Sequence, residues 1–425
     1  MALKLIEAHN FKSFRDLRLE LSDLNVLIGA NGAGKSNVLS LLRFIRDIAS
    51  DGLVNAVALQ GGFDYITNLS IGRTKPVELK LTLIPDPKVL SRRNSNLRNK
   101  KFTARSIQTV YSISLLADGN RDSFAIPVDR VEIEFEIYQL DDEKQQPRST
   151  GNITFSKENG TIKRHVLLPE GIEPGEIFLV YSMAGAENQA FAEYERPGTI
   201  MEDDARSPLS RWDPFDLASN LKSMAIFDIN VHPIKQLVQV QAKADLEEDG
   251  SNLAIVLRRI LANPEQQRML TNLLHDVLPF IVDIETEQFA DRFLVLKLRE
   301  SYNKQALPAS LLSDGTVYVV ALIVALYFSR RSLIAIEEPE KHIHPYLLAR
   351  VAELLKDAAQ RTPVIVTTQN PELVRNVDIQ SLLLVTRDKE GFSTIRRPAE
   401  SDDVRAFLQN EIGVADLFTQ NLLGV

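Results

Sequence analysis

The sequence contains no cysteine, and this absence excludes several classes of protein at once. Disulfide frameworks, zinc knuckles, iron–sulfur clusters and thiol nucleophiles all require that residue. Long apolar runs are also missing: the longest, residues 317–328, is too short to cross a bilayer and is typical of a buried core helix. The chain does not open on a basic-then-apolar leader. We therefore expect a cytoplasmic protein without a membrane-spanning segment.

An excess of positive charge is missing as well. The 49 basic and 57 acidic side chains give a formal net charge of −8, so the protein as a whole does not attract nucleic acid, and any DNA contact must be a local patch. Apolar residues make up 44% of the chain and charged residues 25%, which are ordinary values for a folded protein. A length of 425 residues predicts two or three structural units.

Hydrophobic periodicity divides the chain into three segments. Apolar stretches that alternate with helical patterns near both ends predict an α/β fold with a mostly parallel sheet, buried on both faces. Short alternating stretches between residues 76 and 167 predict an inserted antiparallel lobe, and residues 201–208 look irregular. The expected segments are 1–75 and 246–425, which form a head, and 76–245, which forms the inserted β-rich lobe. Strands are expected at 3–8, 17–21, 24–28, 333–336, 364–368 and 382–385. Helices are expected at 252–262, 315–328 and 346–360, and a further helical pattern begins near residue 38.

A glycine-rich turn lies between an apolar strand and a helix near the N-terminus. Residues 29–36, GANGAGKS, satisfy GxxxxGK[ST] in the strand–turn–helix context that this pattern requires. Small residues let consecutive backbone N–H groups curl round a phosphate chain at a helix N-terminus. Lys35 then reaches the β- and γ-phosphates of ATP, and the Ser36 hydroxyl ligates Mg²⁺. The predicted phosphate-binding residues are Asn31, Gly32, Ala33, Gly34, Lys35 and Ser36.

Two further features lie near the C-terminal end. The apolar residues 333–336 precede Glu337 and Glu338, which places both carboxylates at the carboxyl edge of a strand, where ligands bind in open α/β sheets. We expect Glu337 to hold Mg²⁺ through its water shell and Glu338 to polarise the attacking water, rather than both to belong to a solvated acidic turn. Residues 312–316, LSDGT, precede an apolar helix, and they form either a simple helix cap or an anion site.

These motifs together resemble the stand-alone ABC-type ATPases of the RecF, SMC and OLD group. The resemblance rests on the glycine-rich loop with its trailing Asn37, on LSDGT, on IEEPE with the following HP, and on AHNFKSFRDLRLEL and DGSNLAIVLRRI. It covers residues 1 to about 70 and 245 to about 390. It implies a head-to-tail dimer that sandwiches two ATP molecules, in which Ser313 and Gly315 of one chain contact the γ-phosphate held by the other. It further implies a nucleotide contact for Asn37 and places Gln60 at the glutamine-loop position, near the metal.

The sequence departs from the family pattern after the strand at 364–368. Thr-His-Ser-Pro is usual there, whereas this chain has TQNP, so that Gln369 takes the place of a histidine. Glutamine still donates a hydrogen bond to phosphate but cannot titrate or carry charge, so we expect slow hydrolysis. A nucleotide-gated scaffold that binds ATP without turning it over is the alternative, and a kinase or a transporter ATPase fits less well.

The resemblance also bears on partners. We expect a homodimer or higher oligomer, no intrinsic nuclease, and a separately encoded nuclease or effector in phage defence or DNA repair. His342 and His344 are more easily explained as turn residues than as a metal pair. One dense basic segment either follows a nucleic-acid backbone or is simply solvated, and we favour solvation. Its members are Arg92, Arg93, Arg98, Lys100, Lys101 and Arg105.

Overall fold

The computed structural model describes residues 2–85, 101–119, 123–139, 146–158, 161–173, 176–179, 193–195, 217–240, 245–290, 292–402 and 414–419. The chain forms two compact units. The first comprises Met1–Leu21, Ser40–Ser223 and Arg387–Thr394, and the second comprises Ser22–Leu39, Met224–Thr386 and Ile395–Val425. The expected irregular segment 201–208 lies outside the described residues, as do Arg92, Arg93, Arg98 and Lys100.

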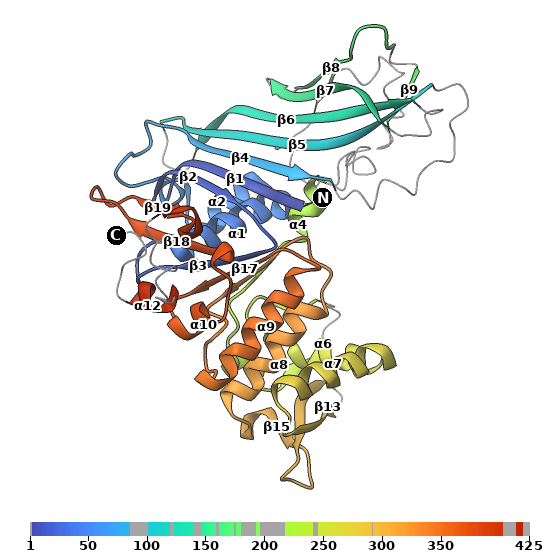
Figure 1. Cartoon of the computed structure of the whole chain (residues 1–425), viewed down its shortest axis with the longest axis vertical. Helices are drawn as coiled ribbons and strands as arrows, with labels where there is room; N and C mark the ends of the chain where they lie inside the picture. Colours follow the sequence, from blue (N-terminus) through green and yellow to red (C-terminus); the bar gives the residue numbers. More distant parts are fainter. Residues whose placement is uncertain are drawn as a thin grey trace. The chain divides into compact units, whose positions relative to one another are not determined.

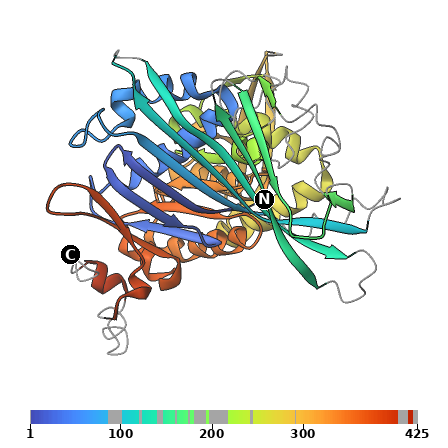
Figure 2. The same ribbon diagram turned by 90° about the horizontal axis from the view of Figure 1, so that it is seen from above.

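The first unit is built on a large sheet with the strand order β10-β8-β7-β6-β5-β4-β1-β2, in which β9 also pairs with β5. Figure 1 shows its long strands β4 to β7 side by side, and in Figure 2 the strands are seen from above with the sheet's progressive twist. The strands are β1 (Ala2–Phe11), β2 (Phe14–Glu20), β4 (Val77–Ile84), β5 (Phe102–Ala117), β6 (Phe124–Gln139), β7 (Pro147–Glu158), β8 (Thr161–Leu167), β9 (Ile177–Leu179) and β10 (Glu193–Glu195).

Alternation of apolar and polar residues explains why these segments form strands with one buried face. In β4, the residues Val77, Leu79, Leu81 and Leu83 are buried, and the residues between them face outward. The pairings from β4 through β8 are antiparallel, as predicted. The helices that belong wholly to this unit are α2 (Leu53–Leu59), α3 (Phe63–Ile66) and α4 (Leu217–Lys222).

The expected segment boundary at residue 75 does not divide the sheet. Strand β4 pairs antiparallel with β1, so the inserted strands continue a sheet that the N-terminal hairpin begins. The expected boundary at residue 245 also falls in the wrong place, because β11 (Ala225–Phe227) pairs with β16 (Ile334–Glu337) in the other unit's sheet. Both errors have one cause: local periodicity identifies a strand but not its partner.

The second unit contains the parallel sheet that the sequence predicts. Its strand order is β11-β16-β17-β3-β18-β19, and the β11–β16, β16–β17, β17–β3 and β3–β18 pairs are all parallel. Its remaining strands are β3 (Leu24–Ile28), β17 (Val364–Thr368), β18 (Leu382–Arg387) and β19 (Ser393–Arg396). All five residues of β3 and of β17 are buried, as expected for a sheet covered on both faces.

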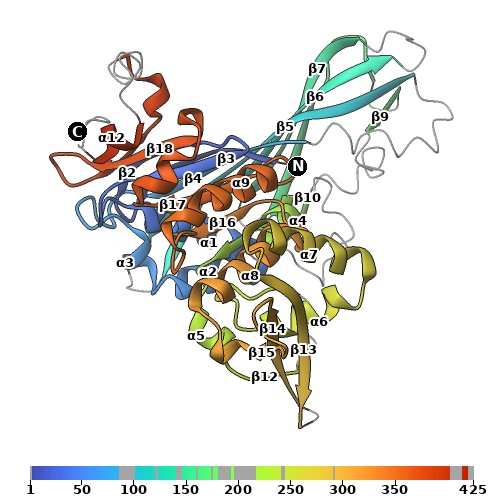
Figure 3. The ribbon, with the colours of Figure 1, turned by 60° about the horizontal axis from the view of Figure 1, so that its bottom comes forward.

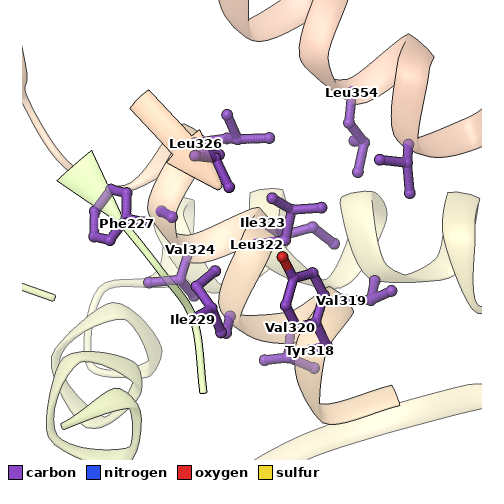
Figure 4. Close-up of a cluster of buried hydrophobic side chains, with 14 of the residues drawn as sticks. Phe227, Ile229, Tyr318, Val319, Val320, Leu322, Ile323, Val324, Leu326 and Leu354 are labelled. Carbon is purple, nitrogen blue, oxygen red and sulfur yellow. The ribbon is translucent and has the colours of Figure 1, made fainter. Parts of the chain in front are cut away.

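Helix α8 (Asp314–Tyr327) lies in the centre of this unit's core. Every residue from Thr316 to Leu326 is buried, which agrees with the prediction of a buried core helix rather than a membrane span. Figure 4 shows Val319, Val320, Ile323 and Val324 of α8 among Phe227, Ile229 and Leu354. The other helices are α1 (Lys35–Asp51), which contributes to both units, α5 (Val231–Ile234), α6 (Leu253–Leu261), α7 (Pro264–Val277), α9 (Leu348–Ala359), α10 (Pro371–Arg375) and α12 (Val414–Thr419), with 3-10 turns at Ala309–Leu311, Pro345–Leu347, Ile379–Ser381 and Pro398–Glu400.

A small sheet, formed by β12 and by three strands between α7 and α8, was not predicted from the sequence. Its order is β12-β14-β13, with β15 also paired to β14, and α6 and α7 pack on it (Figure 3). Its strands are β12 (Val238–Gln239), β13 (Ile281–Phe289), β14 (Phe293–Glu300) and β15 (Leu307–Pro308). In the described part of the chain, we find no helix that is both long and apolar enough to cross a membrane.

Candidate functional site

The glycine-rich loop at 29–36 connects β3 to α1, and its backbone explains why glycines are needed. Gly32 and Gly34 have φ angles of 76° and 119°, which side-chain-bearing residues rarely adopt. A Cβ atom on Gly29 would lie 2.3 Å from the carbonyl oxygen of Val385, so no larger residue fits there. The loop therefore passes closely over β18 and then turns its backbone into the start of α1.

Lys35 is the first residue of α1, and its side chain folds back over the loop. Its Nζ donates to the carbonyl oxygens of Gly29 at 2.7 Å and of Ala30 at 3.0 Å. Only 8% of the residue is exposed. Burial lowers the pKa of Lys35, and the nearby charges of Glu338, Glu340 and Glu337 oppose this effect. A buried ammonium group next to carboxylates is well placed to neutralise phosphate oxygens.

Ser36 and Glu337 meet although they lie 301 positions apart in the sequence. The Ser36 hydroxyl donates to Glu337 Oε1 at 2.8 Å, and the pair is exposed to solvent. Glu337 ends β16, and the loop that carries Ser36 follows β3; β17 lies between these two strands. A hydroxyl oxygen and a carboxylate oxygen are the ligands that Mg²⁺ prefers, so these two side chains fit the ion that the family implies.

Glu338 has a left-handed backbone with φ of 47°, an uncommon conformation for a residue with a side chain. Its N–H donates to the Thr367 carbonyl oxygen at 3.0 Å, and its own carbonyl oxygen accepts a hydrogen bond from the buried Tyr318 hydroxyl at 3.3 Å. Such strained residues cluster at functional sites, where the surrounding structure holds them in place.

Gln369, directly after β17, contacts the Glu338 side chain. Its Nε2 donates to Glu338 Oε1 at 2.8 Å. The other carboxylate oxygen of Glu338 lies 3.8 Å from the ammonium group of Lys341, which in turn pairs with Asp228 at 3.0 Å. The residue that replaces the expected histidine therefore binds the carboxylate that we expect to activate water.

The LSDGT turn, residues 312–316, caps α8. The Ser313 hydroxyl accepts a hydrogen bond from the Thr316 N–H at 3.1 Å, and Lys235 fixes Asp314 through an ion pair of 2.5 Å. A Cβ atom on Gly315 would lie 2.6 Å from the carbonyl oxygen of His342. The turn is thus tightly packed against the segment that follows Glu338. His342 Nδ1 lies 3.9 Å from an Asp314 carboxylate oxygen, and His344 caps a 3-10 turn.

The remaining predicted residues lie as follows. Asn31 is exposed in the loop, and the N–H of Asn37 donates to the Gly34 carbonyl oxygen at 3.0 Å within the first turn of α1. Gln60 ends α2 in the first unit, whereas the glycine-rich loop belongs to the second, so its proposed place near the metal stays a prediction. The resemblance also implies that residues near Phe11 to Arg15 lie by the adenine, which stays a prediction. Phe11 is fully buried and stacks on Phe44 with ring centroids 5.9 Å apart.

Sequence reasoning missed three residues that shape the site. Tyr318 and Thr368 lie on α8 and β17 and are fully buried, and Glu340 belongs to the acidic stretch but was given no role. Thr368 Oγ1 lies 2.5 Å from Glu340 Oε1. The two threonines that end the otherwise apolar strand, Thr367 and Thr368, were the available signal.

Two protein-family models match the chain. The model described as "AAA ATPase domain" matches residues 1–165, and the model described as "AAA domain, putative AbiEii toxin, Type IV TA system" matches residues 189–375. The first match contains the glycine-rich loop. The second contains LSDGT, both carboxylates that follow β16, and Gln369.

Solved structures of SMC heads share the fold. A crystal structure of an Smc head bound to the C-winged helix domain of ScpA gives a TM-score of 0.52 at 12% identity, and covers 93% of this chain and 98% of that chain. An Smc head with an extended coiled coil, bound to the C-terminal domain of ScpA from Pyrococcus furiosus, gives 0.50 at 12% identity, with coverage of 96% and 99%.

A characterised relative is the chromosome partition protein Smc of Thermoplasma acidophilum, which is 34% identical over 98 residues. The match covers 20% of this chain and 9% of that much longer protein. The two family models therefore match ATPase domains in the N-terminal and the C-terminal part of the chain, and the Smc heads share its fold. These findings agree with the resemblance of its motifs to those of the RecF- and SMC-like ABC-type ATPases.

Proposed function

We propose that this chain binds Mg-ATP, hydrolyses it slowly and acts as a nucleotide-dependent switch. The observation that carries the proposal is the convergence of side chains beyond the carboxyl ends of β3, β17 and β16, three neighbouring parallel strands. The ligand site of an open α/β sheet lies at this edge. The converging residues are Lys35, Ser36, Glu337, Glu338 and Gln369.

Each of these residues has a role in the proposed reaction. The loop N–H groups and Lys35 hold the phosphates, and Ser36 with Glu337 would hold Mg²⁺, which neutralises charge on the β- and γ-phosphates when bound. Glu338 orients a water molecule and accepts its proton as the water oxygen bonds to the γ-phosphorus. The bond from that phosphorus to the β–γ bridging oxygen breaks, and ADP and phosphate leave.

We expect slow turnover because Gln369 takes the place of a histidine. A neutral amide does not titrate and has no positive charge to offer the γ-phosphate. Its hydrogen bond to Glu338 Oε1 orients the carboxylate and leaves the other carboxylate oxygen for water.

The switch itself is proposed to be a head-to-tail homodimer. Ser313 and Gly315 would face the γ-phosphate bound by the other subunit, through an interface that presents the same patch on both chains. ATP would then select the closed pair of heads by its higher affinity for that state.

We further propose a protein effector, such as a separately encoded nuclease, as the partner that senses this state in DNA repair or phage defence. Both Smc heads above were crystallised with a domain of a partner protein. The described part of the basic segment gives less support to DNA as a partner, because its basic groups already have partners within the chain. Lys101 pairs with Glu176 at 2.8 Å, and Arg105 lies over the Tyr138 ring at 4.7 Å.

The proposal is tested by the molar mass in solution, measured by light scattering with and without Mg-ATP, together with ATP turnover. Parent and Glu338→Gln are compared. We expect ATP to drive or tighten a dimer, most clearly in the Gln variant, which should hydrolyse ATP far more slowly than the parent. Equal turnover by the two proteins would refute the role of Glu338.

The second candidate is a scaffold that binds ATP without hydrolysing it. The observation that favours it is again Gln369, which can neither titrate nor carry charge. Single-turnover hydrolysis separates the two functions: a scaffold leaves the bound ATP intact over many hours, whereas a slow switch converts one equivalent to ADP.

A further inference from the structure

Two hydrogen bonds join the segments that follow β16 and β17. One is the bond from Gln369 to Glu338, and the other joins Thr368 Oγ1 and Glu340 Oε1 at 2.5 Å. They lie in opposite order along the two segments, since Thr368 precedes Gln369 whereas its partner Glu340 follows Glu338 by two residues. The segments are therefore connected at two adjacent places.

The direction of the second bond follows from the backbone. Thr368 Oγ1 accepts a hydrogen bond from the Asn370 N–H at 3.0 Å, so its own proton is available for Glu340 Oε1. Thr368 thus connects to the residue after Gln369 and to the acidic segment at the same time. The position of Gln369 between these anchored neighbours depends on the threonine hydroxyl.

Glu340 is an unusual hydrogen-bond partner for the Thr368 hydroxyl. Its Oε2 atom is buried and, within the described residues, has no hydrogen-bond partner. Burial raises the pKa of this carboxyl, the nearby charge of Glu338 adds to the increase, and the hydrogen bond with Thr368 opposes it. The hydrogen bond from Thr368 therefore offsets part of the cost of burying this carboxyl group.

We propose that Thr368 and Glu340 are positioning residues that together hold Gln369 against Glu338. This inference rests on the proposed ATP hydrolysis and adds the contacts that set its geometry. Thr368 and Glu340 act through Gln369, and nothing requires either to touch the nucleotide. Without the hydrogen bond between Thr368 and Glu340, the Gln369 side chain can adopt other conformations. Glu338, whose backbone is left-handed, is then held less firmly.

The test measures kcat and KM for Mg-ATP hydrolysis in matched pairs of variants. Thr368→Val removes the hydroxyl but keeps the shape, and we expect kcat to fall about five- to tenfold, the size of one lost hydrogen bond, with KM within about twofold. Thr368→Ser keeps the hydroxyl and should retain parent kcat within about twofold. Glu340→Gln, which keeps an oxygen that can accept the Thr368 proton, should likewise retain it, whereas Glu340→Leu should lose as much as Thr368→Val.

A double-mutant cycle tests whether the pair acts through Gln369. Thr368→Val should lower kcat less than about twofold when introduced into Gln369→Ala, because the residue it positions is already gone. An equal loss in both backgrounds would overturn the inference, and so would a loss in Thr368→Ser as large as in Thr368→Val. Thermal unfolding of each variant identifies any that fail to fold.

The same data separate this inference from the proposed function. If the parent turns over ATP and Glu338→Gln does not, hydrolysis stands, and the cycle alone decides on Thr368 and Glu340. If the rate of ATP hydrolysis by the parent does not exceed that by Glu338→Gln, the proposed hydrolysis is refuted, and the positioning role is refuted with it.

Discussion

Replacing Gly315 with alanine should destabilise the nucleotide-free protein, and the structure gives the size of the effect. The added Cβ atom would lie 2.6 Å from the His342 carbonyl oxygen. Common carbon–oxygen contacts begin at about 3.3 Å, so the neighbouring segment must move by about 0.7 Å. His342 has little freedom to move, because its own backbone is left-handed with φ of 61°.

Two opposing contributions set the magnitude. Overpacking of a tight contact costs about 1–3 kcal/mol, whereas alanine is favoured over glycine by about 1 kcal/mol inside a helix and by less in the first turn. The net loss is therefore about 1–2 kcal/mol. For a cooperative unit of ordinary size this lowers Tm by about 2–8 °C.

Thermal unfolding followed by circular dichroism, without nucleotide, measures this loss apart from any role of Gly315 in binding phosphate. Gly391→Ala is the control: its φ is 86° and nothing lies within 4 Å of its Cβ position, so it strains the backbone of the turn between β18 and β19 without crowding a neighbour. Gly315→Ala should also lower ATP turnover, since the shifted segment follows Glu338, whereas the control should not. A Gly315→Ala protein as stable as the parent would refute the tight contact.

Three further predictions concern single side chains. Ser36→Ala should weaken nucleotide binding measured by calorimetry with Mg²⁺ and leave binding in EDTA nearly unchanged; equal losses would contradict its role as a metal ligand. Tyr318→Phe should lower the free energy of unfolding by about 0.5–1 kcal/mol, because it removes the hydroxyl that donates to the Glu338 carbonyl oxygen, and an unchanged urea midpoint would show that this bond contributes nothing. The pKa of Glu340 is raised above 4.5, so the parent protein loses stability as the pH rises from 4.5 through that raised value. Glu340→Gln should therefore be more stable than the parent at neutral pH and equally stable well below pH 4.5. A difference in stability that does not change with pH would contradict this prediction.

Local signals explain what the sequence predicted well. The glycine-rich loop, the buried strands and the apolar helix α8 each carry a pattern within a few residues, and their positions are confirmed. The expected site residues Lys35, Ser36, Glu337, Glu338 and Gln369 converge, although their roles stay predictions.

Features that depend on distant partners were missed. The small sheet around β14 and the place of β11 beside β16 are set by pairing, which short apolar stretches do not specify. The left-handed backbone of Glu338 depends on contacts with Thr367 and Tyr318, which come from two other elements. The bond between Thr368 and Glu340 was missed for the same reason.

The position of β3 has a consequence for how the protein is made. Leu24 pairs with Val364 and Val26 with Leu382, so both neighbours of this strand are synthesised long after it. Until then, the five residues of β3, all of which are buried in the fold, lack their neighbouring strands, and non-local pairing of this kind is slow. A nascent chain that stops before β17 has the glycine-rich loop but not the sheet that supports it. The loop that we propose to bind phosphate can therefore take up its final position only after β17 and β18 have been synthesised.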